Sequence, residues 1–463
     1  MVHKLQSTQI NQTKVLILGG GFAGISVLRQ LQKIIKKNKQ LKITLVNEDN
    51  FFLFTPMLQE IASGMLHPSS ISIPLRVFSK DSEFIQAKVS SVDLKNKLVA
   101  ITRKFDGKVK VLDYDYLIIA IGSTTNFFGN KRIEKNSFTI KTIQDAIAIK
   151  THLINMMEIA DNEENQAIQE KILTVAVVGA GFAGVEVISE LNDFVKDSIK
   201  SYYHNIDPAN VKMILVSAKA GILPELGEGL AQKAYESLEK AGIRIIPNTK
   251  AVDAGEDFVF LGNGETIPCA TLIWTAGVTI DSVITSLECE HNGGRIVVDS
   301  YLRMPSYDNV FALGDCAAIT DTKTGSLYPP TAQHALRESK IVTHNLKCAI
   351  TKNGSQKPFN FESKGMMAVI GKGNGIAKIF GYDLSGIPAW FVWRTYYLTM
   401  LPTFEKKLKV AIDWTVNLFF RRDITLVRKI KRKSLNKFDL DDISSLDVML
   451  FKKEEPAPDQ KVT

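Results

Sequence analysis

The stretch KVLILGGGFAG, residues 14–24, decides the fold of this chain. Apolar residues of strand type lead into three consecutive glycines, and a helical pattern follows to about Lys37. A second strand is expected at Ile43–Val46. Strand, glycine turn, helix and strand in this order predict a parallel sheet with helices packed against it.

The same succession starts again in the stretch LTVAVVGAGFAG, residues 173–184. The two stretches match residue by residue through the turn, and their first glycines, Gly19 and Gly179, are 160 positions apart. A spacing of this size is too long for a short repeat. It predicts a duplicated domain.

The glycine spacing Gly-x-Gly-x-x-Gly predicts that each copy binds a dinucleotide. The first glycine permits the tight turn, the second lets a pyrophosphate approach the backbone, and the third lets helix and strand pack closely. The phosphates then lie at the helix N-terminus, where unpaired N–H groups favour negative charge. The predicted contacts are Gly19, Gly20, Gly21, Phe22, Ala23 and Gly24 in the first copy, and Gly179, Gly181, Phe182 and Gly184 in the second.

A residue at the end of the second strand is expected to bind the ribose of each dinucleotide. In the first copy Asn47 and Glu48 hold this place, and in the second copy Ser217 does. A carboxylate there would bond the 2′-hydroxyl and repel a 2′-phosphate. Ser217 is neutral and Lys219 lies two positions after it, so the substrate could be NADPH as well as NADH. The alternative is that Lys219 is only a solvated loop charge.

Three further apolar strands end in small residues: Tyr114–Gly122, Leu272–Gly277 and Asn309–Asp315. The last of them places the carboxylate of Asp315 just beyond a buried strand, where it could bond the ribityl chain of FAD. Arranged around two glycine turns, these strands predict a flavoprotein that also binds a nicotinamide dinucleotide.

Composition limits the alternatives. A chain of 463 residues is too long for one core. The net charge of +8 favours an anionic partner without choosing among nucleotides, phosphates and acidic membranes. The four cysteines form no CxxC pair and are expected as free thiols, and the seven histidines lack the spacing of metal ligands. No apolar run reaches the roughly 18 residues that span a bilayer, so any membrane contact would be at the surface.

These motifs resemble the two-dinucleotide flavoprotein superfamily, and within it the type II NADH dehydrogenases, which are single-chain NADH:quinone oxidoreductases. The more specific signatures are NFFLFTP at 50–56, YDYLIIAIG at 114–122, GVE at 184–186, PTAQ at 330–333 and the segment 393–423. The resemblance implies an α/β fold with two Rossmann-type domains of the glutathione reductase kind and a C-terminal amphipathic region at a membrane interface. We expect an FAD domain at 1–140 and 290–384, an NAD(P)H domain at 141–289, and the membrane-associating region at 385–463, with 158–171 as a solvated connection or helix end.

The resemblance also implies roles for single residues. FAD would be held by the first turn together with Asn47, Glu48, Val89, Ala120, Gly122, Gly314, Asp315, Ala332 and Gln333. The nicotinamide dinucleotide would be held by the second turn with Ser217 and Gly277. Glu186 and Gln333 would act where nicotinamide, flavin and quinone meet. From the residues alone, Glu186 could instead be a structural carboxylate stabilised by the helix dipole. Arg337 replaces a glutamine of the family's quinone-side motif, which puts the identity of the quinone in doubt.

The C-terminal segment 406–422 carries a polar stripe on an otherwise apolar helix. Its polar residues recur every four positions, at Lys409, Asp413, Asn417 and Arg421. Such a helix either docks on the body of the protein or lies in a membrane interface. The basic run at 428–433 and the family resemblance favour the membrane, and a dimer contact stays open.

We therefore expect an enzyme that passes electrons from NADH, or NADPH, through FAD to a membrane quinone without pumping protons. It would bind the cytoplasmic face of the cell membrane, with no nucleic acid partner and a homodimer left open. One alternative is a sulfide:quinone oxidoreductase, which would need a cysteine pair beside the flavin, where only Cys316 and Cys348 come into question. The other is a flavin- and NAD-binding protein of slow turnover, like apoptosis-inducing factor.

Overall fold

The computed structural model describes residues 12–35, 41–363 and 365–426. The basic run at 428–433 and the tail beyond it lie outside the described residues, so the part of the membrane prediction that rests on them stays a prediction.

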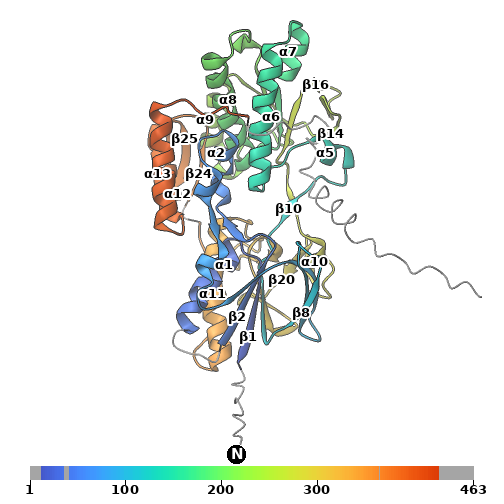
Figure 1. Ribbon diagram of the computed structural model, residues 1–463. Coiled ribbons are helices and arrows are strands. Elements are labelled where there is room, and N and C mark those ends of the chain that lie inside the picture. Colours follow the sequence, from blue (N-terminus) through green and yellow to red (C-terminus); the bar gives the residue numbers. More distant parts are fainter. Residues whose placement is uncertain (1–11, 36–40, 364, 427–463) are drawn as a thin grey trace, which may run out of the picture.

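The first glycine turn lies at the carboxyl end of an inner strand in a sheet of six strands. In spatial order these are β21 (Arg303–Met304), β22 (Tyr307–Ala312), β9 (Tyr116–Ile119), β1 (Thr13–Leu18), β2 (Leu41–Asn47) and β5 (Glu83–Gln86). All neighbours pair in parallel except β21 with β22. Helices α1 (Phe22–Ile35) and α11 (Ala332–Thr351) pack against one another beside this sheet (Figure 1). We call this unit the first module.

The second glycine turn lies at the carboxyl end of an inner strand in a parallel sheet of four strands. In spatial order these are β13 (Ile243–Ile246), β12 (Lys212–Val216), β11 (Thr174–Val178) and β17 (Thr271–Trp274). Its helices include α6 (Ile143–Asp161), α8 (Phe182–Tyr202) and α9 (Glu228–Lys240). Here β11 lies between β12 and β17 as β1 lies between β2 and β9. This second module repeats the strand arrangement of the first, which confirms the predicted α/β fold with two Rossmann-type units.

Shorter elements complete the two modules. They are β3 (Phe51–Leu53), α2 (Leu58–Ala62), α3 (Pro68–Ile71), β4 (Ser72–Pro74), α4 (Leu75–Phe78), β6 (Lys88–Asp93), β7 (Leu98–Thr102), β8 (Val109–Asp113), α5 (Lys131–Asn136), β14 (Ala251–Ala254), β15 (Phe258–Leu261), β16 (Thr266–Pro268), α10 (Ser282–Thr285), β19 (His291–Asn292), β20 (Arg295–Val297) and β23 (Ala317–Ala318). Four single-turn 3₁₀ helices lie at Thr55–Met57, Pro208–Asn210, Pro224–Leu226 and Gly314–Cys316.

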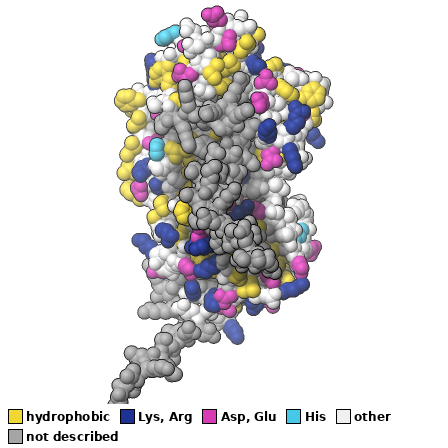
Figure 2. Space-filling view, turned by 45° about the vertical axis from the view of Figure 1, so that its right-hand side comes forward, with side chains coloured by type: hydrophobic (Ala, Val, Ile, Leu, Met, Phe, Trp, Pro, Cys, Tyr) yellow, Lys and Arg dark blue, Asp and Glu magenta, His cyan; other side chains and the backbone are white. Residues whose placement is uncertain are grey.

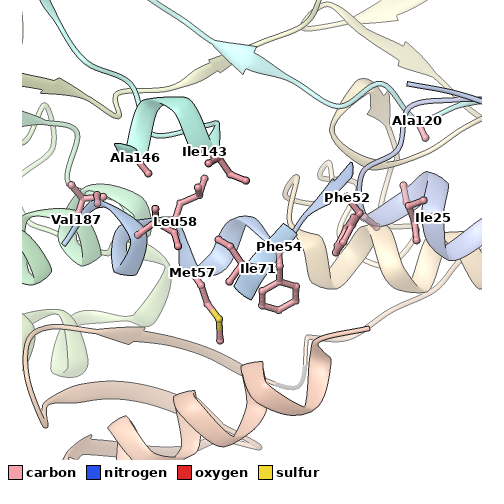
Figure 3. Close-up of a cluster of buried hydrophobic side chains, with 14 of the residues drawn as sticks. Ile25, Phe52, Phe54, Met57, Leu58, Ile71, Ala120, Ile143, Ala146 and Val187 are labelled. Carbon is pink, nitrogen blue, oxygen red and sulfur yellow. The ribbon is translucent and has the colours of Figure 1, made fainter. Parts of the chain in front are cut away.

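A strand pair and a helix are among the described elements that join the modules. Strand β10 (Thr124–Thr125) pairs with β18 (Val278–Thr279) in the narrow region between them (Figure 1). Helix α2, which follows β3 of the first module, packs against α6 and α8 of the second. In Figure 3 its residue Leu58 lies among Ile143, Ala146 and Val187. The core is therefore continuous from one module to the other.

The segment 158–171 differs from a plain solvated connection. Helix α6 ends at Asp161, as one of the two expectations has it, but a further helix, α7 (Gln166–Ile172), follows. Asn165 caps α7 by accepting from two backbone N–H groups, and the side chain of Gln169 is buried. The acidic composition hid this helix, because a cap and a few inward positions are enough to form it.

The chain ends in an antiparallel sheet and a helical hairpin. Strands β24 (Gly365–Val369), β25 (Gly375–Ile379) and β26 (Tyr382–Gly386) lead into α12 (Ile387–Met400) and α13 (Phe404–Phe419), which stand along one side of the second module (Figure 1). Among the described residues, the helices are all too short or too polar to cross a membrane.

Candidate functional site

Both glycine turns have the geometry that a dinucleotide requires. Gly19 has φ +104° and Gly179 has φ +112°, a region that side chains rarely adopt. A Cβ on Gly24 would lie 1.9 Å from the carbonyl oxygen of Gly19, so only glycine lets α1 approach the turn. The second copy repeats this contact, with 1.8 Å between a Cβ on Gly184 and the first glycine's oxygen.

The middle glycine of each turn faces open space. No heavy atom lies within 4 Å of a Cβ built on Gly21 or on Gly181, among the residues that the structure describes. Helices α1 and α8 begin at the next residue, so their unpaired N–H groups lie beside this opening. The residues present therefore fit a pyrophosphate at each turn, and so a dinucleotide in each module.

The two ribose candidates of the first module have different surroundings. The side-chain oxygen of Asn47 accepts from Gly20 N at 2.7 Å, and its amide nitrogen donates to the backbone oxygen of Asp49 at 2.9 Å. Asn47 thus orders the turn itself. The carboxylate of Glu48 is exposed and pairs with Lys104 at 3.1 Å. Val89 is buried on β6.

Strands β22, β9 and β1 run parallel, so their carboxyl ends lie together. Asp315, which follows β22, is therefore at the same end of the sheet as the first turn, which follows β1. Ser123 Oγ donates to Asp315 Oδ2 at 2.6 Å, and Lys141 Nζ donates to Ser123 Oγ at 3.1 Å. Burial lowers the pKa of Lys141 while Asp315 opposes that shift. Gly122, after Ala120 at the end of β9, has φ +84°.

Glu338 of α11 also lies at this end of the sheet, and it was not predicted from the sequence. Its Oε2 accepts from the backbone N–H of Gly314 at 2.7 Å, which ties α11 to the turn before Asp315. Burial raises the pKa of Glu338 to about 7, and the nearby Asp315 adds to the shift. Its place six residues after Ala332, in a helix that covers the sheet, is the signal that could have found it.

Ala332 and Gln333 begin helix α11, and Thr331 caps it. Gln333 Nε2 donates to Ser363 Oγ at 3.2 Å, so the side chain points to the segment before β24. Arg337 donates to the backbone oxygen of Gln333 at 2.9 Å, and its guanidinium lies 4.4 Å from the centre of the Phe361 ring.

Glu186 connects the second module to the C-terminal segment. It lies in the second turn of α8, and its Oε1 accepts from Val369 N at 3.2 Å and from Trp393 Nε1 at 3.1 Å. Within the described part of the chain, its Oε2 has no hydrogen-bond partner. Burial raises the pKa of Glu186 to about 8 against the opposing effect of the hydrogen bonds from Val369 and Trp393, so the carboxyl is mostly protonated at neutral pH.

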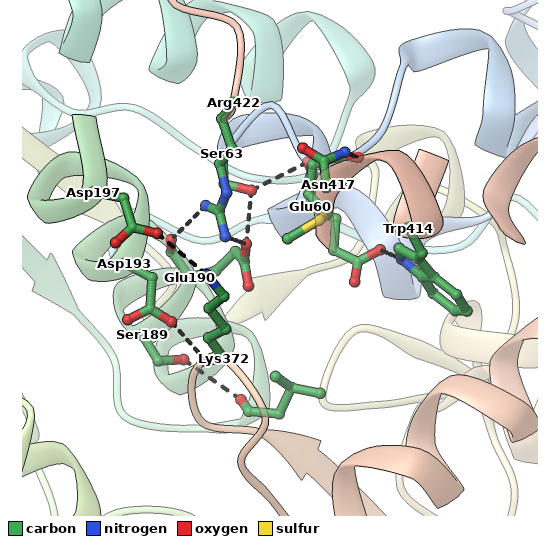
Figure 4. Close-up of polar contacts among 12 residues, drawn as sticks. Glu60, Ser63, Ser189, Glu190, Asp193, Asp197, Lys372, Trp414, Asn417 and Arg422 are labelled. Atoms are coloured by element: carbon green, nitrogen blue, oxygen red, sulfur yellow. Dashed lines mark hydrogen bonds and ion pairs between the residues drawn. The ribbon is translucent and has the colours of Figure 1, made fainter. Parts of the chain in front are cut away.

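A buried cluster of carboxylates lies one helical turn beyond Glu186 (Figure 4). Glu190 Oε1 pairs with Arg422 at 2.9 Å and accepts from Ser63 Oγ at 2.9 Å. Glu60 Oε2 accepts from Trp414 Nε1 at 3.0 Å, and burial raises the pKa of Glu60 to about 7. We call Glu60, Glu190 and Arg422 the carboxylate cluster. It joins α2, α8 and the segment after α13.

In the second module, Ser217 follows β12 and is buried, with its Oγ donating to Gly221 O at 2.7 Å. Gly277, after β17, has φ +114° and accepts from Asn126 N at 3.2 Å. These two residues follow neighbours of β11 on either side, as the sequence predicts for residues that flank the second turn.

The polar stripe predicted for this segment is only partly turned toward the protein, and the buried residues of α13 are Lys406, Val410 and Trp414. Asp413 Oδ2 accepts from Ser70 Oγ at 2.7 Å, Asn417 donates to Met65 O at 2.9 Å, and Arg421 donates to Ser201 O at 3.3 Å. Lys409 instead pairs with Glu405 on its own helix. The helix docks on the body through the side that carries Val410, Asp413 and Trp414, which is one of the two predicted arrangements, and the membrane contact stays a prediction.

The other side of α13 exposes large apolar side chains. We define the outer apolar face as Phe404, Leu408, Ile412, Val416, Phe419 and Phe420 of this segment together with Ile387 and Phe391 of α12, all exposed. Phe404 and Phe419 are each 79% exposed. The face of the molecule seen in Figure 2 instead mixes basic, acidic and apolar side chains. Clustered exposed apolar side chains are typical of surfaces that contact lipid or another protein.

All four cysteines are free thiols, as predicted. Cys316 is buried in the turn after β22 and donates to the backbone oxygen of Leu313 at 3.4 Å. Cys348 lies 15 positions after Gln333 on the same helix, which is about 22 Å along its axis. Cys316 and Cys348 are both free, so they are not joined as the pair that a sulfide oxidoreductase would need.

Comparison with known proteins gives concordant matches. The pyridine nucleotide-disulphide oxidoreductase family matches residues 13–339, and the NDH2 C-terminal domain matches residues 363–423. A probable NADH dehydrogenase of Dictyostelium discoideum is 34% identical over 90% of this chain and 92% of the relative. The type II NADH:quinone oxidoreductase Ndh of Mycobacterium tuberculosis is 28% identical over 88% of this chain and 89% of its own length.

Solved structures share the fold. NDH2 from Plasmodium falciparum, in complex with NADH, superposes with a TM-score of 0.83 at 22% identity, covering 89% of this chain and all (100%) of that one. The sulfide:quinone oxidoreductase of Aquifex aeolicus gives a TM-score of 0.66 at 20% identity, covering 88% and 96%.

Proposed function

We propose that, in this member of the type II NADH dehydrogenases, Glu186 and Gln333 act on the quinone during its reduction. The family consists of FAD-dependent pyridine nucleotide-disulphide oxidoreductases that pass electrons from NADH to a quinone. The observation that supports the proposal is the position of Glu186. It follows the second glycine turn and is bonded to the C-terminal segment through Val369 and Trp393.

The first module is the proposed holder of FAD, in a domain made of residues 1–140 and 290–384. The opening beside Gly21 would receive the pyrophosphate, and Glu48 would bond the ribose of the adenosine half. Asp315, held by Ser123, would bond the ribityl chain. The N-terminus of α11, at Ala332 and Gln333, adds unpaired N–H groups. When bound, FAD supplies the two-electron chemistry that the side chains lack.

The second module, residues 141–289, is the proposed site of the nicotinamide dinucleotide. The opening beside Gly181 would receive its pyrophosphate, since it has the same geometry as the opening in the first module. Gly277 lies after β17, where its lack of a side chain leaves room next to Phe128 and Asn126. The segment after β12 borders this turn, because Leu223 N donates to Ala180 O at 2.9 Å.

Glu186 is the proposed source of a proton. Reduction of a quinone to a quinol takes two electrons and two protons, whereas NADH brings two electrons and one proton. The second proton must come from a protein group or from water. Glu186 is mostly protonated at pH 7 and its Oε2 is unbonded among the described residues, so it can deliver that proton and take another from solvent. Gln333, with an amide that both donates and accepts, would orient the quinone.

Residues 385–463 form the proposed membrane-associating region. Because Asp413 and Asn417 are bonded to the body and Trp414 is buried against it, the outer apolar face points away from the body. Insertion of this face into the interface of a bilayer would remove it from water and bring the site close to a lipid-soluble quinone. We place the protein on the cytoplasmic face of the cell membrane. A homodimer that buries the same face is the competing arrangement.

The test is a steady-state assay of the purified protein with NADH and a soluble short-chain quinone. Glu186→Gln keeps the hydrogen bonds to Val369 and Trp393 but cannot supply a proton, so the quinone-dependent kcat should fall about 100-fold while FAD stays bound. The exposed Glu225→Gln is the matched control in the same module. Full activity of Glu186→Gln would remove this residue from the mechanism. Bound FAD without turnover in the wild-type chain would favour the binding protein of slow turnover.

A further inference from the structure

Lys141 is a half-buried lysine at the point where the chain enters helix α6 of the second module. Its Nζ donates to Ser123 Oγ at 3.1 Å, and Ser123 Oγ in turn donates to Asp315 Oδ2 at 2.6 Å. These three side chains therefore connect the second module to the carboxylate that would bond the ribityl chain of FAD.

Local structure fixes the backbone of both Lys141 and Ser123. Thr142 caps α6, and the carboxylate of Asp145 accepts from the backbone N–H groups of Lys141 at 2.9 Å and of Thr142 at 3.0 Å. Ser123 lies between Gly122, which has φ +84°, and strand β10, which pairs with β18. The lysine side chain therefore starts from a capped helix end and reaches a residue that follows the sheet of the first module.

Asp315 is held at its backbone and at its side chain by different elements. The preceding residue, Gly314, has φ +74°, and its N–H donates to Glu338 Oε2 of α11 at 2.7 Å. The side chain of Asp315 is instead held by Ser123. Because a carboxylate side chain has several rotamers, the bond from Ser123 determines which of them Asp315 adopts.

The ammonium group of Lys141 has more donors than the protein uses. It carries three N–H groups, and within the residues that the structure describes only the bond to Ser123 is made. Burial lowers the pKa of Lys141, and the attraction of Asp315 opposes that shift. A half-buried charge with unused donors destabilises a fold unless a ligand completes its bonds, and such groups gather at functional sites.

We propose that Lys141 is a positioning residue for FAD, which reaches across from the second module and holds Asp315 on the cofactor through Ser123. The inference rests on the proposed function, because Asp315 has this task only if FAD binds in the first module. It means that the FAD site is completed by a residue of the other module. The positive charge would also favour reduced FAD, which carries more negative charge than oxidised FAD.

The first test follows the release of FAD from the diluted holoenzyme through the fluorescence of the free flavin. Lys141→Met should raise the dissociation constant of FAD about tenfold, because a charge-assisted hydrogen bond is lost. Ser123→Ala should have an effect of similar size, and the double variant should also lose about tenfold, since both changes break the same connection. The control Lys150→Met removes another half-buried lysine of α6, which interacts with Asp423 instead, and should leave FAD release unchanged.

The midpoint potential of the bound flavin separates an effect on the cofactor from an effect on folding alone. Lys141→Met should shift the equilibrium toward oxidised FAD about tenfold, which lowers the two-electron potential by about 30 mV. Lys150→Met should leave the potential unchanged.

Wild-type values of both FAD release and potential in Lys141→Met would overturn the inference. So would losses that multiply to about 100-fold in the double variant, since Lys141 and Ser123 would then act separately. If Lys141→Met does not fold, Ser123→Ala alone decides, because unchanged FAD release in that variant would also overturn the inference. A wild-type chain that takes up no FAD would contradict the proposed function instead.

Discussion

The two modules contain the same glycine turn in different surroundings. Around the first turn, Asn47 bonds Gly20, and Glu338 ties the covering helix α11 to Gly314. Around the second turn, the strand end after Ser217 is an exposed loop, and Glu186 reaches into the C-terminal segment. We propose that the turn provides the dinucleotide site in each module, and that the surroundings set whether the dinucleotide is retained as a cofactor or exchanged as a substrate.

The largest effects are expected when the space beside each glycine turn is filled separately, because each change should then affect one nucleotide and not the other. A Cβ added at Gly21 or Gly181 has no described heavy atom within 4 Å, so we expect the fold to accept a valine there, whose side chain would fill the space of the pyrophosphate. Gly21→Val should give a folded, colourless protein without FAD. Gly181→Val should stay yellow and lose about 100-fold in kcat/KM for NADH.

Absorbance spectra and steady-state rates measure both effects. Gly229→Val, at another open glycine on α9, is the control and should change neither. A yellow Gly21→Val protein, or a colourless Gly181→Val protein, would mean that the modules have been assigned to the wrong nucleotides.

The second module differs from the first in its buried ion pair to the C-terminal segment. Arg422→Ala would leave Glu190 buried without its partner and should lower the free energy of unfolding by about 3–5 kcal/mol. The neighbouring Arg421→Ala removes an exposed guanidinium that makes one hydrogen bond and lies over the Tyr202 ring, and it should cost about 1 kcal/mol. Urea unfolding of both variants measures the difference. Equal losses would show that the carboxylate cluster does not hold the C-terminal segment in place.

A third comparison is between apolar surfaces. Ile412→Asp with Phe419→Asp should weaken binding to lipid vesicles at least about tenfold, because each change removes an exposed apolar group from the outer apolar face. Turnover with a soluble quinone should be unchanged. Val109→Asp with Val111→Asp makes the same chemical change on β8 of the first module and should leave vesicle binding intact. If the α13 variant still floats with vesicles but elutes as a smaller particle, the face is a dimer contact.

The smallest effect concerns pH. Burial raises the pKa of Glu60 from 4.5 to about 7, so between these values the folded protein holds a proton that the unfolded chain releases. Stability should therefore fall as pH rises through this window, and Glu186 extends the fall to about pH 8. Glu60→Gln can still accept from Trp414 and should reduce the slope by at most about 1.4 kcal/mol per pH unit. An unchanged slope in chemical unfolding from pH 5 to 7 would show that Glu60 titrates normally.

Local patterns predicted much of this arrangement. Both turns, the strands before them and the place of Asp315 follow from short runs in which each residue has a steric or hydrogen-bonding task. The carboxylate cluster could not be predicted, because Glu60, Glu190 and Arg422 meet only through packing of distant segments, although Glu190 lies one turn after Glu186. The stripe on α13 was visible in the sequence, but a stripe does not say which side of a helix docks. The docked side depends on contacts with a distant segment, since Ser70 donates to Asp413 and Met65 accepts from Asn417.

Rapid mixing of the purified, FAD-loaded protein with NADH in the absence of oxygen tests most directly whether the two modules work on one another. The yellow absorbance should disappear within the time of one turnover and return when a soluble quinone is added. Absorbance that NADH leaves unchanged, in a protein that demonstrably binds both nucleotides, would contradict the account.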